Sequence, residues 1–87
     1  MDAREEAARG ARIQEFLSDP IIRGAFDTLE TNLFEQWKRA AAVDERERLH
    51  AKVSVLEDFR GSLETIRNDG ERAQIELDAD RDRPARR

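Results

Sequence analysis

Apolar residues recur at helical spacing along two long stretches of the chain. The first stretch runs from Pro20 to about Ala41, and its apolar positions are four, three, four and four residues apart. These positions are Ile22, Phe26, Leu29, Leu33 and Trp37. At about 100° per residue they lie within an arc of about 80°, which is one face of an α-helix. The pattern predicts a helix over residues 20–41 that buries this face.

The aromatic residues of this stretch leave two interpretations open. Phe34 lies beside the stripe, and we expect it to extend the apolar face toward a second partner. Trp37, Lys38 and Arg39 could form an exposed aromatic and basic contact point. The interpretation we favour is that Trp37 closes the apolar face, while the two cations stabilise the helix C-terminus.

The second stretch predicts a helix over residues 45–69. Its six apolar positions have a period of about 3.4 residues, close to the value of about 3.5 that is typical of coiled coils. They are Leu49, Val53, Leu56, Phe59, Leu63 and Ile66. Gly70 follows Asn68 and Asp69 and is suited to a left-handed cap, so we expect the helix to end there. Gly61, inside the helix, is interpreted as a close backbone approach.

Capping signals separate the predicted helices. Asp19 and Pro20 are suited to the N-cap and the first position of a helix, which ends an Ala-rich N-terminal helix over residues 3–17. Asp44 and Glu47 have the spacing of a capping box, which predicts a break at residues 42–44. A connection this short makes the flanking helices antiparallel neighbours.

The predicted fold is therefore all-α: an antiparallel helical hairpin with an additional N-terminal helix. Residues 1–77 form the single domain of this prediction, with helices over 3–17, 20–41 and 45–69. Ala73, Ile75 and Leu77 fit either a short strand or docking segment or one helical turn. Residues 78–87 alternate acidic and basic side chains, and we predict a disordered charged tail there.

Composition points to assembly with protein partners. The chain has 87 residues, of which 38% are hydrophobic and 41% are charged, so its own core is small. It has no Cys, so neither disulfides nor thiolate metal sites can compensate for the small core. Association with partner subunits is the remaining way to stabilise the fold, and we expect a homo-oligomer, a larger assembly, or both. No apolar run approaches the roughly 18 residues that span a bilayer, and the acidic N-terminus lacks a signal-peptide core, so we expect a soluble protein that is not exported.

Charge and motifs argue against nucleic-acid binding and catalysis. The formal net charge is −4, and no segment forms a basic patch; a nucleic-acid role would rest on Arg83, Arg86 and Arg87 alone. There is no Gly-rich phosphate loop, and spacing alone does not place the single His at catalytic distance from Ser18, Ser54 or Ser62. We predict that the protein is not an enzyme and has no cofactor.

Glu47 and His50 have the Glu-x-x-His spacing that di-iron helical bundles use. Relative to the apolar stripe, however, Glu47 points almost directly away from the predicted core, and His50 lies at its flank. The interpretation we favour is a capping Glu47 and a half-exposed His50. A ferritin-like metal-binding hairpin remains a third hypothesis for function.

Residues 16–73 resemble a family of small helical proteins encoded by tailed bacteriophages. The likeness rests on Asp19-Pro20, a later aromatic residue with Trp37, an acidic and basic turn, and a helix ending in Gly70. The resemblance implies a phage protein of the host cytoplasm or the virion, acting as a virion or head-assembly component. It brings no catalytic residue, and the position of His50 tends to be aromatic or apolar in that family. The alternative hypothesis is an acidic regulatory binder, in which carboxylates imitate phosphates to inhibit a host nucleic-acid enzyme.

Overall fold

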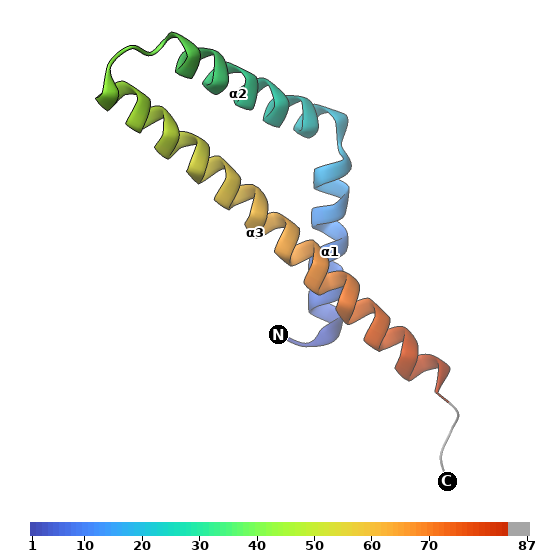
Figure 1. The fold of residues 1–87 in the computed structure, drawn as a ribbon. Helices are drawn as coiled ribbons and strands as arrows, with labels where there is room; N and C mark the ends of the chain where they lie inside the picture. The colour runs from blue at the N-terminus through green and yellow to red at the C-terminus, as the bar shows by residue number, and fades with distance from the viewer. Residues whose placement is uncertain (84–87) are drawn as a thin grey trace. The chain divides into compact units, whose positions relative to one another are not determined.

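The computed structural model describes residues 1–83, and almost all of them are helical (Figure 1). The helices are α1 (Ala3–Ser18), α2 (Pro20–Arg39) and α3 (Val43–Asp82), and this described range contains no strand. The all-α class predicted from the sequence is confirmed. No helix within residues 1–83 is long and apolar enough to cross a membrane.

The chain divides into two compact units, and α3 contributes to both. The first unit joins Met1–Phe16 of the α1 region to the described residues from Leu63 onward. The second unit is Leu17–Ser62 and joins α2 to the first half of α3. The single domain predicted for residues 1–77 stays a prediction.

The N-cap residue Asp19 determines where α2 begins. Asp19 is extended, with φ −65° and ψ 124°, and its Oδ1 accepts the Ile21 N–H at 2.8 Å and the Ile22 N–H at 3.4 Å. Pro20 takes the first helical position, where its missing N–H costs nothing because that group has no partner within the helix. The predicted N-cap is confirmed, and α2 ends at Arg39, two residues earlier than expected.

The predicted capping box at the start of α3 is wrong. The helix begins at Val43, because the Ala42 carbonyl already accepts the Arg46 N–H at 3.1 Å. Asp44 therefore lies inside the first turn and forms a 3.7 Å ion pair with Arg48. Its carboxylate still lies near the positive end of the helix dipole, which is a smaller stabilisation than a cap.

The predicted helix end at Gly70 is also wrong. α3 continues to Asp82, and no glycine among the described residues has a positive φ. Residues 73–77 are helical rather than extended, and residues 78–82, predicted as disordered tail, belong to the same helix. Residues 84–87 of that tail lie outside the described range. The physical reason is that the stripe continues past Gly70 at spacings of three and four residues, through Ala73 to Leu77.

Gly70 instead lies at a close approach of α1 and α3. A Cβ added at Gly70 would lie 2.5 Å from the Gly10 Cα, and one added at Gly10 would lie 2.6 Å from the Gly70 Cα. Both glycines are buried, and α1 crosses the second half of α3 at this point (Figure 1). The close approach interpreted at Gly61 is wrong, since a Cβ there would meet nothing within 4 Å.

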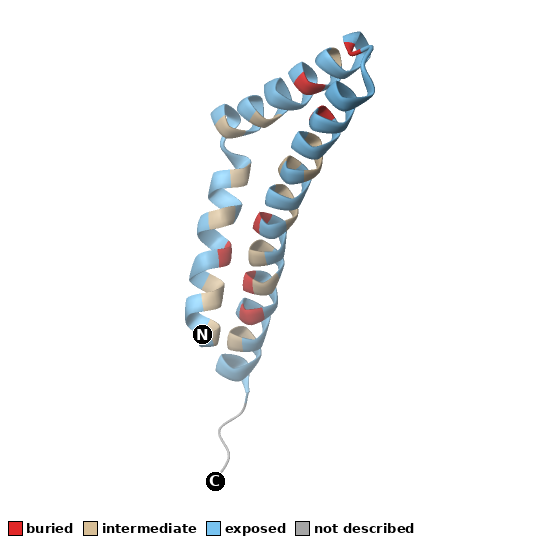
Figure 2. Cartoon of the chain, turned by 90° about the vertical axis from the view of Figure 1, so that its left-hand side faces the viewer, coloured by how far each residue is buried: buried red, intermediate tan, exposed pale blue. Residues whose placement is uncertain are grey.

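Few side chains of the second unit are buried. Leu33 and Ala40 of the α2 region pack with Leu49 of α3, and Val53 and Leu56 lie against this cluster. Buried positions lie on the facing sides of the helices, and most other positions are exposed (Figure 2). None of the described large side chains is fully buried. The pair of helices therefore leaves much apolar surface uncovered.

Candidate interaction surface

Arg46 connects the end of α2 to the start of α3. Its Nε donates to the Ala40 carbonyl oxygen at 2.7 Å, and its guanidinium lies 5.1 Å from the centre of the Trp37 ring. The Ala40 N–H donates back to the carbonyls of Gln36 and Trp37, at 3.0 and 3.2 Å. Arg46 thus satisfies a carbonyl at the C-terminal end of α2 and holds Trp37 by a cation–π contact. Lys38 and Arg39, the cations predicted to stabilise this helix end, lie in the last turn of α2. The role of Arg46 was not predicted.

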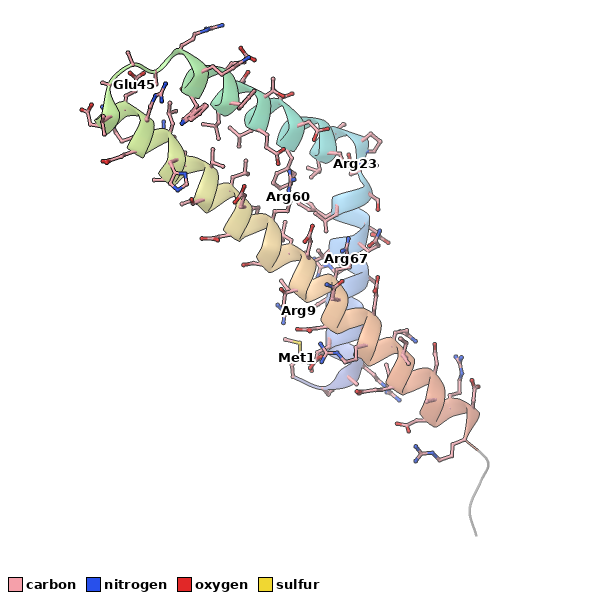
Figure 3. The ribbon with its side chains drawn as sticks, in the orientation of Figure 1. Met1, Arg9, Arg23, Glu45, Arg60 and Arg67 are labelled. Carbon is pink, nitrogen blue, oxygen red and sulfur yellow. The ribbon has the colours of Figure 1, made fainter. Side chains whose placement is uncertain are left out.

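Farther from the turn, α2 and α3 are joined by an aromatic and an ionic contact. Phe26 and Phe59 stack with ring centres 6.3 Å apart and an angle of 28° between the planes. Arg60 reaches from α3 toward α2, where it pairs with Glu30 and lies 5.0 Å from the centre of the Phe26 ring (Figure 3). These contacts fix the register of the two helices and leave the two sides of the pair open.

One side of the pair carries exposed aromatic residues among charges, and we call it the Phe34 face. Phe34 and Trp37 stack at 6.4 Å with an angle of 12°, and 56% and 43% of their surfaces are exposed. Lys38 lies 5.0 Å from the centre of the Phe34 ring and pairs with Glu35 at 3.0 Å. A groove runs along this face. The residues lining it are Glu30, Leu33, Phe34, Trp37, His50, Val53, Leu56, Glu57 and Arg60.

The opposite side carries an almost uncharged groove, and we call it the Val55 face. Leu29, Val55 and Phe59 remain 46%, 67% and 52% exposed. The groove is lined by Leu29, Leu33, Ala51, Lys52, Val55, Leu56 and Phe59. Lys52 is the single charged residue in this lining. Val55 was absent from the predicted stripe, although its spacing of four residues from Ala51 and from Phe59 indicates a second apolar row.

The structure places the predicted packing residues at three levels of burial. Leu33, Leu49 and Leu63 are buried. Ile22, Phe26, Val53, Leu56 and Ile66 are half-buried. Leu29, Phe34, Trp37 and Phe59 are exposed. Four small residues that the predicted stripes did not include are also buried. They are Gly10, Ala40, Gly70 and Ala73.

Glu47 and His50 are both exposed, and His50 borders the groove of the Phe34 face. Among residues 1–83, no group of three or more His, Cys, Asp or Glu side chains is placed to hold a metal ion.

Within residues 1–83, six of the 20 acidic side chains pair with a cation close to them in the chain. Examples are Asp69 with Arg72 at 2.6 Å, and Asp78 with Arg81 at 3.3 Å. Each such pair is exposed and contributes at most about 1 kcal/mol to stability. These pairs nevertheless place positive charge beside negative charge along parts of α2 and α3.

No protein-family model, curated protein or solved structure matches the chain.

Proposed function

We propose that the protein is a non-enzymatic structural protein that acts by helix–helix packing, as a virion or head-assembly component of a tailed bacteriophage. In this proposal α2 and the first half of α3 form an antiparallel helical hairpin. Its exposed faces dock on protein partners in the host cytoplasm or in the virion. The phage assignment follows the resemblance of residues 16–73.

The observation that carries the proposal is the exposure of large apolar side chains on both sides of the α2–α3 pair. Phe34 and Trp37 lie on one side, and Val55 and Phe59 on the other, each more than 40% exposed. Contiguous exposed apolar patches are typical of protein interaction sites. Aromatic residues are also enriched at the centres of such interfaces, because they bury a large area with few rotatable bonds.

The ion pairs favour this function over the acidic regulatory binder. A protein that imitates nucleic acid needs unpaired carboxylates spaced like phosphates. Here Asp44, Asp69, Asp78 and Asp80 each lie within 4 Å of an Arg nitrogen. The groove of the Phe34 face likewise mixes Glu30 and Glu57 with Arg60. Alternating signs suit an exposed helix in a mixed protein assembly better than a phosphate-like surface.

The test uses cells that produce the phage whose genome encodes the chain. A photoreactive benzoylphenylalanine replaces Phe34, and mature particles and head precursors are purified and analysed by quantitative mass spectrometry. We expect a fixed copy number per particle or precursor, and cross-links from position 34 to one particle protein. Thr28, which is exposed and lies about 120° around α2 from Phe34, provides the control position. Absence of the chain from both particles and precursors, or equal cross-linking from positions 28 and 34, would contradict the proposal.

A further inference from the structure

We propose that the two compact units of the chain bend relative to each other about a hinge. One part of the hinge is the break between α1 and α2 at Asp19, and the other part is the pair Gly61 and Ser62 inside α3. This hinge does not depend on the proposed function. It also explains Gly61, where an added Cβ would meet nothing within 4 Å, so that no close packing requires a glycine there.

Two covalent connections join the units, and each contains a position where a helix bends readily. The first boundary lies between Phe16 and Leu17, in the last turn of α1 and just before Asp19. The second boundary directly follows Gly61 and Ser62. Paired glycine and serine residues are among the few known causes of sharp helix kinks. Both boundaries therefore coincide with local features that permit bending.

At the first connection, the opening turn of α2 takes its hydrogen bonds from its own unit. Pro20 has no N–H to donate. The N–H groups of Ile21 and Ile22 donate to the Asp19 carboxylate, and the N–H of Arg23 donates to the Asp19 carbonyl oxygen at 2.9 Å. These acceptors belong to the same unit as α2. Rotation about the backbone that precedes Asp19 therefore breaks none of these bonds.

At the second connection α3 is continuous, so the bend must occur within the helix. Glycine populates helical conformations less readily than any residue except proline, because its unfolded backbone has the most freedom. Next to Gly61, the Ser62 hydroxyl donates to the Asp58 carbonyl oxygen at 3.0 Å. A serine that bonds to the carbonyl four residues earlier weakens the helix slightly and often bends it. The two residues together make this the weakest point of α3 near the boundary.

Contacts inside each unit hold α3 on both sides of this point. Arg60 pairs with Glu30 of α2, which fixes α3 within the second unit as far as residue 60. Leu63 is buried within the first unit, where the Gly10 and Gly70 backbones meet. Because the units are joined at two points, the easiest motion is rotation about the line through both points. Each unit keeps its own contacts while the angle between the units changes.

The absence of cysteine allows spin labels to be attached at chosen pairs of introduced cysteines. Ala8 and Thr31 are exposed and lie in different units, so this pair reports the bend. The controls are Ala8 with Gln74, inside the first unit, and Thr31 with Lys52, inside the second. Pulsed electron paramagnetic resonance in excess unlabelled protein measures distances within one copy. We expect the 8–31 distance distribution to be at least about 2-fold broader than either control; equal widths would overturn the hinge.

A matched pair of glycine substitutions tests whether the motion arises at Gly61. Alanine favours the helix over glycine by about 5-fold, so Gly61→Ala should lower the bent population about 5-fold and narrow the 8–31 distribution. Gly24→Ala makes the same change in open space inside α2, away from both boundaries, and should leave that width unchanged. No narrowing by Gly61→Ala, or equal narrowing by both, would overturn the hinge. Narrowing by Gly61→Ala alone would support the hinge whatever the particle cross-links show about the proposed function.

Discussion

The crossing of α1 and α3 makes the strongest prediction about the fold, because four glycines lie in helices and only two of them are crowded. Replacing Gly70 by Ala adds a Cβ 2.5 Å from the Gly10 Cα and 2.9 Å from the Glu6 carbonyl oxygen. Nonbonded carbon atoms normally lie about 3.5 to 4.0 Å apart. Every close atom belongs to a backbone, so no side chain can rotate away. The helices must therefore separate by about 1 Å or more.

The magnitude follows from comparison with Gly61. Ala stabilises a helix interior by about 0.8 to 1.0 kcal/mol relative to Gly, and this gain is common to both positions. At Gly61 nothing opposes it, because an added Cβ has no neighbour within 4 Å. At Gly70 the overpacking cost of about 1 to 3 kcal/mol opposes it. The propensity gain cancels between the two variants, so Gly70→Ala should be about 1 to 3 kcal/mol less stable than Gly61→Ala.

Hydrogen exchange locates this loss at the α1–α3 contact. We expect amides of α1 to exchange about 5-fold to 150-fold faster in Gly70→Ala than in Gly61→Ala, if the crossing opens locally. Gly10→Ala should behave like Gly70→Ala, and the double variant should cost less than the sum, because the first Cβ has already separated the helices. Gly24→Ala should match Gly61→Ala, since its Cβ also has open space. Equal effects of all four substitutions would refute the crossing.

Three further predictions concern the helix ends and the polar residues. Arg46→Ala should lower the free energy of unfolding by about 1 to 2 kcal/mol in urea titrations, since it removes the donor to the Ala40 carbonyl and the cation on Trp37. The control is Arg48→Ala, which removes only an exposed ion pair and should lower the free energy of unfolding by less than about 0.5 kcal/mol. Asp19→Ala should cost about 1 kcal/mol by the same assay, whereas Asp44→Ala should cost only a few tenths, about 0.3 kcal/mol, because Asp44 does not cap α3. His50→Ala should leave helicity and the dilution behaviour of the protein unchanged, as followed by circular dichroism and light scattering, because His50 is exposed at a groove edge.

Local chemistry explains why the start of α2 could be predicted and the end of α3 could not. At Asp19 and Pro20 the signal is complete within two residues, because a short carboxylate and a fixed φ define the cap without help from the fold. At Gly70 the local signal favours a cap, yet the glycine is helical. Its role depends on Gly10, sixty positions earlier, and nothing in a single sequence indicates that these two residues are in contact.

A signal for the longer α3 was nevertheless present. Leu63, Ile66, Gly70, Ala73 and Leu77 are spaced three, four, three and four residues apart, which is the spacing of a coiled-coil stripe. The prediction considered only the tendency of glycine to end a helix, and it therefore ended the stripe at Gly70. A glycine inside a heptad pattern is better interpreted as a contact point, because only a residue without Cβ lets two backbones approach this closely.

The candidate interaction surface could be predicted only in part from the sequence. Helical spacing identifies one apolar stripe per helix, and those stripes meet at Leu33 and Leu49, inside the α2–α3 pair. A partner surface needs a second row on the same helix, and Val55 with Ala51 and Phe59 forms one that a single-stripe interpretation overlooks. In a chain so rich in charge, two apolar rows on one helix are best explained if that helix packs twice, once against α2 and once against another chain. The exposure of Val55 and Phe59, beside the row that packs on α2, therefore supports the proposal that this pair of helices docks on a further protein.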